Sequence, residues 1–326
     1  MFFSMKNIIK QFNILLLLLP VVFTANAQDF DKVDNTVKSY PKSFSNTDKI
    51  AEQINRDFKR DDEKARAIFS WIAFNVKYDV AAYGVNERPV AFSYKTEEEK
   101  IAKQKKFKED LAEKTLKSKK GVCQGYATLF MVVADKVGLE AEIIPGTSKS
   151  HPAHIGKGPG ANDHAWNAVK INGEWKLLDP TWGAGTVTGE GFKFKFNDKY
   201  FFAHPDVFFL NHFPDDKKWL LTDKTEADFA DLPLYYGNYL KGGYEFVNPD
   251  GGSYKAQPSK LPFKIKNLKP EDRIAYVFSR DRVFKEVQPI RNGNTAEFEV
   301  LLDRASAGHL TIYINEVSVA AYSINR

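Results

Sequence analysis

Apolar residues recur with a helical period in three stretches of this 326-residue chain. The stretches cover residues 46–58, 61–72 and 121–137. In the last stretch the apolar positions are spaced i, i+3, i+4, i+7 and i+11: Tyr126, Leu129, Phe130, Val133 and Val137. A spacing of three and four residues places such side chains on one face of a helix. We therefore predict three helices, the third beginning just after Gly121 and ending before Gly138.

The segments between these helices carry other patterns. Residues 29–45 show little periodicity and are predicted to be an extended lead-in, and residues 80–96 a loop. Residues 95–120 are charged almost throughout, with both signs interleaved. Mixed signs at helical spacing are typical of a solvated helix rather than of a nucleic-acid or membrane-binding patch.

Two alternating runs between residues 164 and 182 predict a β-hairpin, because they are joined by Asn-Gly at 172–173. A two-residue turn there would place Trp166 opposite Asp179 and His164 opposite Thr181. All four side chains would then share one face. The residues His164 and Asp179 would be diagonal neighbours within reach of a hydrogen bond.

After Pro249 the pattern changes to short alternating runs separated by Pro, Gly, Asn and Asp. Such runs predict an all-β sandwich with Ig-like strand spacing. We place the boundary between two domains near Phe229. The predicted organisation is thus a leader at 1–27, an α+β domain at 28–228 and a β-sandwich domain at 229–326.

The N-terminus resembles a secretory signal peptide. Lys6 and Lys10 precede an apolar run over residues 14–23, and Ala-Asn-Ala at 25–27 follows. About ten apolar residues are too few to span a bilayer, and the small residues suit cleavage near Ala27. We expect an exported protein, periplasmic or extracellular, with no stable membrane anchor.

Composition narrows the function classes further. A hydrophobic content of 43% is enough for substantial cores, and a net charge of +5 is too mild to indicate nucleic-acid binding. A single cysteine excludes an intramolecular disulfide scaffold. The oligomeric state stays open.

The single cysteine, Cys123, lies where the third helix begins. A thiol attacks only as the thiolate, which a helix N-terminus and a nearby imidazolium both favour. If the hairpin packs across the helix start, His164 would supply the imidazole and Asp179 would orient it, as in other nucleophile–base–carboxylate sets. The alternative is that Cys123 is a small buried apolar residue.

Other candidate residues give weaker indications of a functional site. His151 and His154 form an H-x-x-H pair, but further metal ligands at suitable spacing are not evident, so we expect neither a metal nor another cofactor. The residues Trp166 and Trp182 could wall a substrate cleft, although core packing explains them equally well. His204 and His212 lie in an aromatic segment and are interpreted as structural.

Four blocks of the sequence resemble one known family. The block "GVCQGYATLF" precedes "DHAWNAVKINGEWKLLDPTWGAG", and both are similar to the transglutaminase-like superfamily of cysteine acyltransferases and peptidases. The flanking "AIFSWIAFNVKYD" and "YFFAHPDVFFLNHFPDDKKWLL" resemble its kyphoscoliosis-peptidase-like branch. The resemblance spans about residues 47–221 and implies a papain-like α+β core with Cys123, His164 and Asp179 as the catalytic triad.

Two departures limit what the resemblance implies. Animal cross-linking transglutaminases have a tryptophan after the cysteine, where this chain has Gln124, and an acidic calcium-binding loop is not evident. We therefore expect a cysteine-dependent enzyme that acts on peptide or glutamine amides of a protein or peptide substrate, with hydrolysis slightly favoured over amine transfer. The alternative is a non-catalytic scaffold that uses the same fold and the sandwich to contact a protein or cell-surface polymer.

Overall fold

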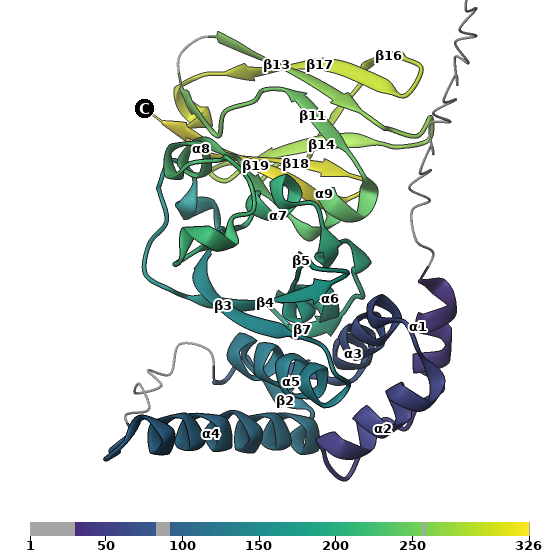
Figure 1. The fold of residues 1–326 in the computed structure, drawn as a ribbon. Helices are drawn as coiled ribbons and strands as arrows, with labels where there is room; N and C mark the ends of the chain where they lie inside the picture. The colour runs from purple at the N-terminus through teal and green to yellow at the C-terminus, as the bar shows by residue number, and fades with distance from the viewer. Residues whose placement is uncertain (1–29, 83–91, 257–258, 326) are drawn as a thin grey trace, which may run out of the picture.

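The computed structural model describes residues 30–82, 92–256 and 259–325. Helices form one layer, a mixed-length β-sheet lies against them, and a second β-rich unit packs beyond the sheet (Figure 1). The predicted leader at 1–27 lies outside the described residues, as does most of the predicted loop at 80–96. In the described part of the chain, no helix has the length and apolar character that crossing a bilayer requires.

Five helices of the N-terminal half pack around one apolar core. They are α1 (Asp31–Lys38), α2 (Thr47–Asp57), α3 (Asp61–Asn75), α4 (Glu97–Ser118) and α5 (Cys123–Lys136). The three helices predicted from periodicity are α2, α3 and α5. The Asn46 side chain caps α2 by accepting the Lys49 N–H at 3.0 Å, which explains why the helix begins there.

Helix α1 contradicts the extended lead-in predicted for residues 29–45. Asp34 on this helix is buried and accepts two hydrogen bonds from the Arg66 guanidinium, at 2.8 and 2.7 Å. Ser70 of α3 donates to the same carboxylate at 2.6 Å. These partners lie more than 30 residues away in the sequence, so the local pattern could not reveal what stabilises the helix.

Helix α4 is exposed over most of its length and carries i,i+4 ion pairs, Lys103 with Glu99 and Lys106 with Asp110. This agrees with the solvated charged helix predicted for residues 95–120. The end of α4 packs closely against the start of α5. There Gly125 leaves room for the Thr115 side chain, because a Cβ at Gly125 would lie 2.8 Å from Thr115 Oγ1.

The sheet over these helices has the strand order β8-β5-β4-β3-β9. Its strands are β3 (Ala141–Ser148), β4 (His164–Ile171), β5 (Glu174–Leu178), β8 (Phe201–Ala203) and β9 (His212–Pro214). The predicted hairpin register is confirmed for the five pairs from Ile171–Glu174 to Asn167–Leu178. Asn172 and Gly173 take positive φ angles of 52° and 84°, as this turn requires.

The predicted pairs beyond Leu178 are wrong. The ladder ends at Asn167–Leu178, and Asp179 instead becomes the N-cap of the short helix α6 (Pro180–Ala184). Proline at the first helical position favours this change, because its fixed φ suits a helix start and it cannot donate to a strand ladder. Asp179 therefore leaves the strand and turns its carboxylate back toward β4.

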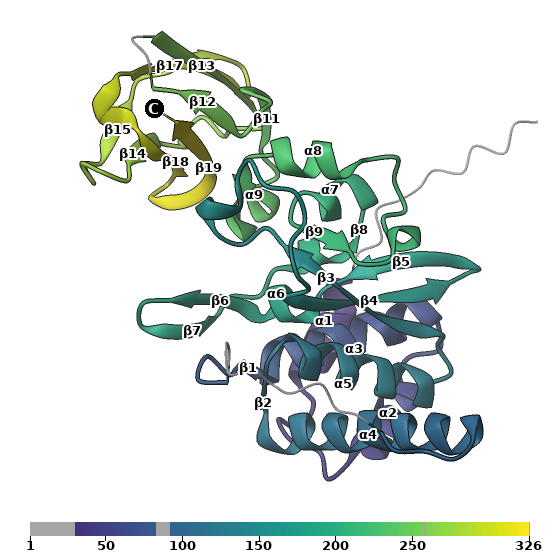
Figure 2. The same cartoon turned by 90° about the vertical axis from the view of Figure 1, so that its left-hand side faces the viewer.

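Short elements complete the first unit. Strand β1 (Lys77–Tyr78) pairs in parallel with β2 (Lys120–Gly121), and β6 (Gly185–Thr188) forms a hairpin with β7 (Gly191–Phe194). Helices α7 (Pro205–Phe209) and α8 (Glu226–Asp231) lie on the side of the sheet that faces the second unit (Figure 2).

The second unit is a β-sandwich, as predicted, with alternating burial along its strands. One sheet has the order β10-β19-β18-β14-β15 with β12 added beside β19, and the other has the order β11-β13-β17-β16. The strands are β10 (Leu234–Tyr235), β11 (Glu245–Asn248), β12 (Ser253–Lys255), β13 (Ser259–Lys266), β14 (Ile274–Phe278), β15 (Lys285–Val287), β16 (Ile290–Asn292), β17 (Thr295–Leu302), β18 (Gly308–Ile314) and β19 (Val317–Asn325).

Helix α9 (Gly237–Gly242) follows β10 and packs on β19. Phe229, where we placed the domain boundary, packs on Phe209 and Phe213 of the first unit. The exact boundary and the Ig-like character of the sandwich stay predictions.

The loop between β3 and β4 joins the two units. Ile155 from this loop packs against Leu234 and Ala321 of the sandwich. Lys149, at the start of the loop, is fully buried and donates to the main-chain carbonyls of Phe229 and Leu232 at the end of α8. The same loop leads directly into His164, so the sandwich supports the segment that positions this residue.

Candidate active site

The site begins with Cys123, the first residue of α5. Its side chain is half-exposed and is not part of a disulfide. The N-cap residue, Val122, has an extended backbone and gives no side-chain cap. The first N–H groups of a helix have no partner within the helix, so the start of α5 offers donors and a favourable dipole to a negative charge at Cys123.

His164 and Asp179 meet beside this helix start. The Nε2 atom of His164 lies 2.7 Å from Oδ2 of Asp179. Both residues are buried, with 8% and 0% of their surfaces exposed. The hairpin prediction therefore found the correct pair, although Asp179 reaches His164 from a helix cap and not from the paired strand.

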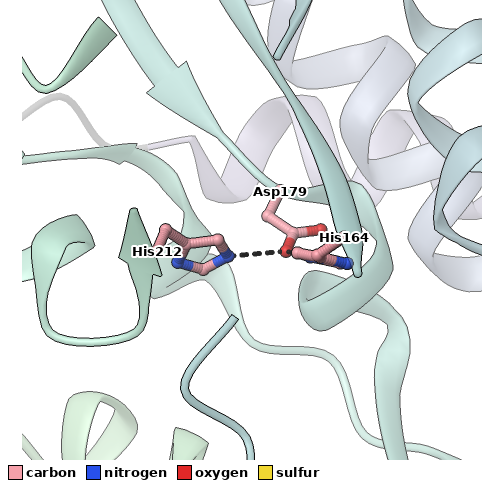
Figure 3. A group of neighbouring side chains, drawn as sticks. All are labelled: His164, Asp179 and His212. Carbon is pink, nitrogen blue, oxygen red and sulfur yellow. Dashed lines mark hydrogen bonds and ion pairs between the residues drawn. The ribbon is translucent and has the colours of Figure 1, made fainter. Parts of the chain in front are cut away.

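The Asp179 carboxylate accepts four hydrogen bonds. Oδ1 accepts the main-chain N–H groups of Thr181 and Trp182, at 2.8 and 3.0 Å. Oδ2 accepts from His164 and also lies 3.0 Å from Nε2 of His212 (Figure 3). A buried carboxylate with this many donors is held in one orientation and stabilised in its ionised form.

The charges of the pair follow from these contacts. Burial disfavours the imidazolium of His164, but Asp179 and Cys123 outweigh burial and raise the pKa of His164 to about 10. Burial would likewise raise the pKa of Asp179, but the two histidines hold it well below its usual range. At neutral pH the pair is an imidazolium and a carboxylate.

Cys123 lies close enough to His164 to help raise the pKa of this imidazole. Because Nε2 of the imidazole is engaged by Asp179, Nδ1 is the ring nitrogen left for the thiol. His164 therefore lies between Asp179 and Cys123. This arrangement allows the imidazolium to stabilise a thiolate at Cys123 and to give its proton to a leaving group.

His212 belongs to this cluster, although its aromatic sequence context predicted a structural role. Strand β9 pairs with β3 so that His212 lies opposite Ser148, while His164 on β4 lies opposite Gly146 of the same strand. Residues 146 and 148 are two apart, so both histidines emerge on one face of the sheet. Only the β3–β9 pairing reveals this, since 48 positions separate the two histidines in the sequence.

The two tryptophans lie around the histidines. Trp166 is buried, with 1% of its surface exposed, and its ring occupies the space over Gly146, where a Cβ would lie 2.4 Å from the indole. Trp182 is half-buried, with its ring centroid 5.5 Å from that of His164. Trp166 therefore packs beneath the cluster, and Trp182 is the one of the two with surface available to another molecule.

The remaining histidines lie apart from the cluster. His151 and His154 each accept a main-chain N–H of their own loop through Nδ1, and exposed His204 does the same at the start of α7. Among the described residues, the donor group of suitable size for a metal ion is His164, Asp179 and His212, whose ligand atoms lie within 4.8 Å of one another. Hydrogen bonds between these atoms already account for their closeness.

The sequence of this chain is similar to known proteins. Residues 48–180 match the family model described as the transglutaminase-like superfamily, and the matched segment includes Cys123, His164 and Asp179. The chain is 29% identical to human kyphoscoliosis peptidase over 249 residues, which is 74% of this chain and 34% of that protein. It is 26% identical to Drosophila melanogaster hillarin over 251 residues, 69% of this chain and 27% of hillarin. The chain thus spans about a third of the length of these curated relatives.

The similar solved structures have a lower sequence identity to this chain than the curated relatives. A crystal structure of a TGase is 19% identical with a TM-score of 0.29, covering 55% of this chain and 40% of that one. Red sea bream transglutaminase is 10% identical with a TM-score of 0.21, covering 81% and 54%. The family match and the curated relatives confirm the resemblance found in the sequence, and residues 48–180 of this chain are a transglutaminase-like domain.

Proposed function

We propose that this chain is an exported cysteine-dependent enzyme that cleaves or transfers the acyl group of peptide or glutamine side-chain amides. The observation that supports it best is the buried pair of His164 with Asp179, beside Cys123 at the start of α5. Two curated relatives, from human and mouse, carry the name kyphoscoliosis peptidase, which favours a peptidase. Export rests on the N-terminal sequence alone.

The residues would act as follows. Cys123 Sγ, as the thiolate of an ion pair with His164, attacks the amide carbonyl carbon, and N–H groups at the start of α5 receive the developing oxyanion. The imidazolium gives its proton to the departing nitrogen as the C–N bond breaks, which leaves a thioester on Cys123. Water or an amine then gives a proton to His164 and attacks the thioester, and the C–S bond breaks to restore the Cys123 thiolate beside the His164 imidazolium.

Hydrolysis is the outcome we favour. Water is always present as an acceptor, and the position after Cys123 holds an exposed glutamine, Gln124, where cross-linking transglutaminases have a tryptophan. Incubation with a glutamine peptide and a primary amine separates the two outcomes by product mass. Hydrolysis gives a deamidated or shortened peptide, whereas transfer gives a conjugate, and a Cys123→Ala variant should give neither.

The first test is the pH dependence of alkylation by iodoacetamide. Cys123 is the single thiol of the chain, so labelling reports on this residue alone, and Cys123→Ala supplies the blank. We expect Cys123 to react with iodoacetamide at pH values well below the free-thiol pKa of about 8.5. In His164→Ala this low-pH reactivity should be lost. An ordinary profile near that value, indifferent to His164, would contradict the enzyme and favour the scaffold.

A further inference from the structure

We propose that His212 is a positioning residue, a neutral hydrogen-bond donor that holds Oδ2 of Asp179 toward His164. The proposal rests on the proposed function, because it concerns the same triad. It assigns to His212 a role that the motifs around Cys123 and His164 do not indicate.

Packing leaves His212 a single orientation. The residue is 2% exposed, and its ring stacks on Phe208 with centroids 4.0 Å apart. The edge of Trp166 lies 5.0 Å away and Trp182 4.7 Å away, measured between ring centroids. A ring enclosed by three aromatic side chains cannot turn away from Asp179 without opening this packing.

Both ring nitrogens of His212 face an acceptor. Nε2 lies 3.0 Å from Oδ2 of Asp179, and Nδ1 lies 3.2 Å from the carbonyl oxygen of Phe208. A neutral imidazole carries one N–H and can donate to only one of them. The ionised carboxylate is the stronger acceptor, so the proton belongs on Nε2.

The surroundings of His212 keep it neutral. Burial lowers the pKa of His212, and the His164 imidazolium lowers it further, against the opposing effect of Asp179. The other titratable group in its ring contacts is Tyr200, with centroids 6.2 Å apart, and burial keeps that phenol protonated. His212 thus faces one carboxylate, one imidazolium and one neutral phenol.

A neutral donor suits this position better than a cation. A protonated His212 would compete with His164 for the Asp179 carboxylate. It would also repel the His164 imidazolium, whose ring centroid lies 5.5 Å from that of His212. A neutral N–H holds the oxygen in place and leaves the carboxylate charge to His164. Without this donor, Asp179 would keep its two main-chain bonds through Oδ1, but Oδ2 would be held by His164 alone.

Two substitutions distinguish the contribution of the His212 N–H donor from that of its aromatic ring. His212→Phe keeps an aromatic ring on Phe208 and removes the donor, whereas His212→Gln keeps an amide N–H near the Nε2 position. His309→Phe replaces a histidine of the sandwich and serves as the matched control. The readout is the rate of Cys123 alkylation by iodoacetamide between pH 5.5 and 9, since a purely structural role would not shift this pH profile.

At about pH 6.5, near the ordinary histidine pKa, we expect the rate of Cys123 alkylation to fall roughly tenfold in His212→Phe. In His212→Gln the same rate should stay within about threefold of wild type. The control should match wild type. A shifted wild-type profile that His212→Phe leaves unchanged would overturn the role of His212 alone. A wild-type profile near the free-thiol value would instead overturn the proposed function.

A measurement on the unsubstituted full chain covers the case in which His212→Phe does not fold. Long-range proton–nitrogen correlation spectra of the histidine rings report which nitrogen carries the proton, with His212→Gln identifying the signals. We expect His212 to be protonated on Nε2 from pH 6 to 8. An Nε2 without a proton over this range could not donate to Asp179 and would overturn the proposal.

Discussion

Asp179 performs two tasks with one carboxylate. Oδ1 caps α6 through the N–H groups of Thr181 and Trp182, and Oδ2 receives the two histidines. Because the helix cap fixes the carboxylate, the ion pair with His164 does not depend on a mobile side chain. Removing the charge while keeping the shape should therefore affect chemistry more than folding.

We predict that Asp179→Asn lowers amide turnover by about 10⁴-fold, the loss seen when a triad aspartate becomes asparagine. The amide oxygen can still cap α6, but its NH2 group would face two histidine donors, so burial would then dominate and lower the pKa of His164. Turnover and the pH profile of alkylation measure the effect. Asp303→Asn, a matched cap in the sandwich that accepts the Ser306 N–H, should change neither, and an unchanged profile in Asp179→Asn would refute the ion pair.

At the scale of elements, the position of Cys123 depends on the contact between α4 and α5. The Thr115 side chain of α4 is buried and lies against both glycines that flank Cys123, Gly121 and Gly125. A Cβ at Gly125 would approach Thr115 Oγ1 to 2.8 Å. Glycine there allows a charged, mostly exposed helix to reach the helix start that carries the thiol.

We predict that overpacking in Gly125→Ala lowers the free energy of unfolding by about 1–3 kcal/mol. The higher helix propensity of alanine offsets roughly 1 kcal/mol of this loss. Urea unfolding would measure the change. Gly158→Ala is the control, since a Cβ there would have no atom within 4 Å and its φ is not in the left-handed region. Adding Thr115→Ala should recover much of the loss, and failure of that rescue would show that the clash is not the cause.

At the scale of the whole molecule, the β3–β4 loop carries Lys149 to the segment that leads from α8 into the sandwich. Its ammonium donates to carbonyls at the end of α8, and Asn211, next to His212, donates to the carbonyls of Lys149 and Tyr235. Burial lowers the pKa of Lys149 to about 8, against the attraction of Asp231. The junction therefore contains an ionisable group whose charge is disfavoured by folding.

We predict that Lys149→Met lowers the free energy of unfolding at pH 7 by about 1–3 kcal/mol, because buried carbonyls lose their donor. Above pH 8 folded Lys149 loses its proton, whereas the unfolded chain keeps it to about pH 10.4. This one residue therefore adds stability as pH rises across that window.

Denaturation of wild type and variant at pH 7 and 9.5 measures both effects, and the difference between the proteins should grow with pH. Exposed Lys260, paired with Glu299 on the sandwich surface, is the control, and Lys260→Met should change stability by less than about 0.5 kcal/mol. A difference that shrinks as pH rises would contradict a lowered pKa for Lys149.

Much of the fold could be read from local sequence. The Asn-Gly turn determined the register of the β4–β5 hairpin, apolar periodicity determined helices α2, α3 and α5, and alternating runs indicated the sandwich. The same local signals brought Cys123 to a helix start and His164 near Asp179. Turn chemistry and side-chain period act over a few residues, so they are visible without tertiary information.

The tertiary structure alone decided two other features. Helix α1 depends on the buried pair of Asp34 with Arg66, and His212 joins the site through the β3–β9 pairing. Each depends on contacts between segments distant in the chain. Such contacts are selected by burial and hydrogen bonding in the assembled core, and a local pattern carries no record of them.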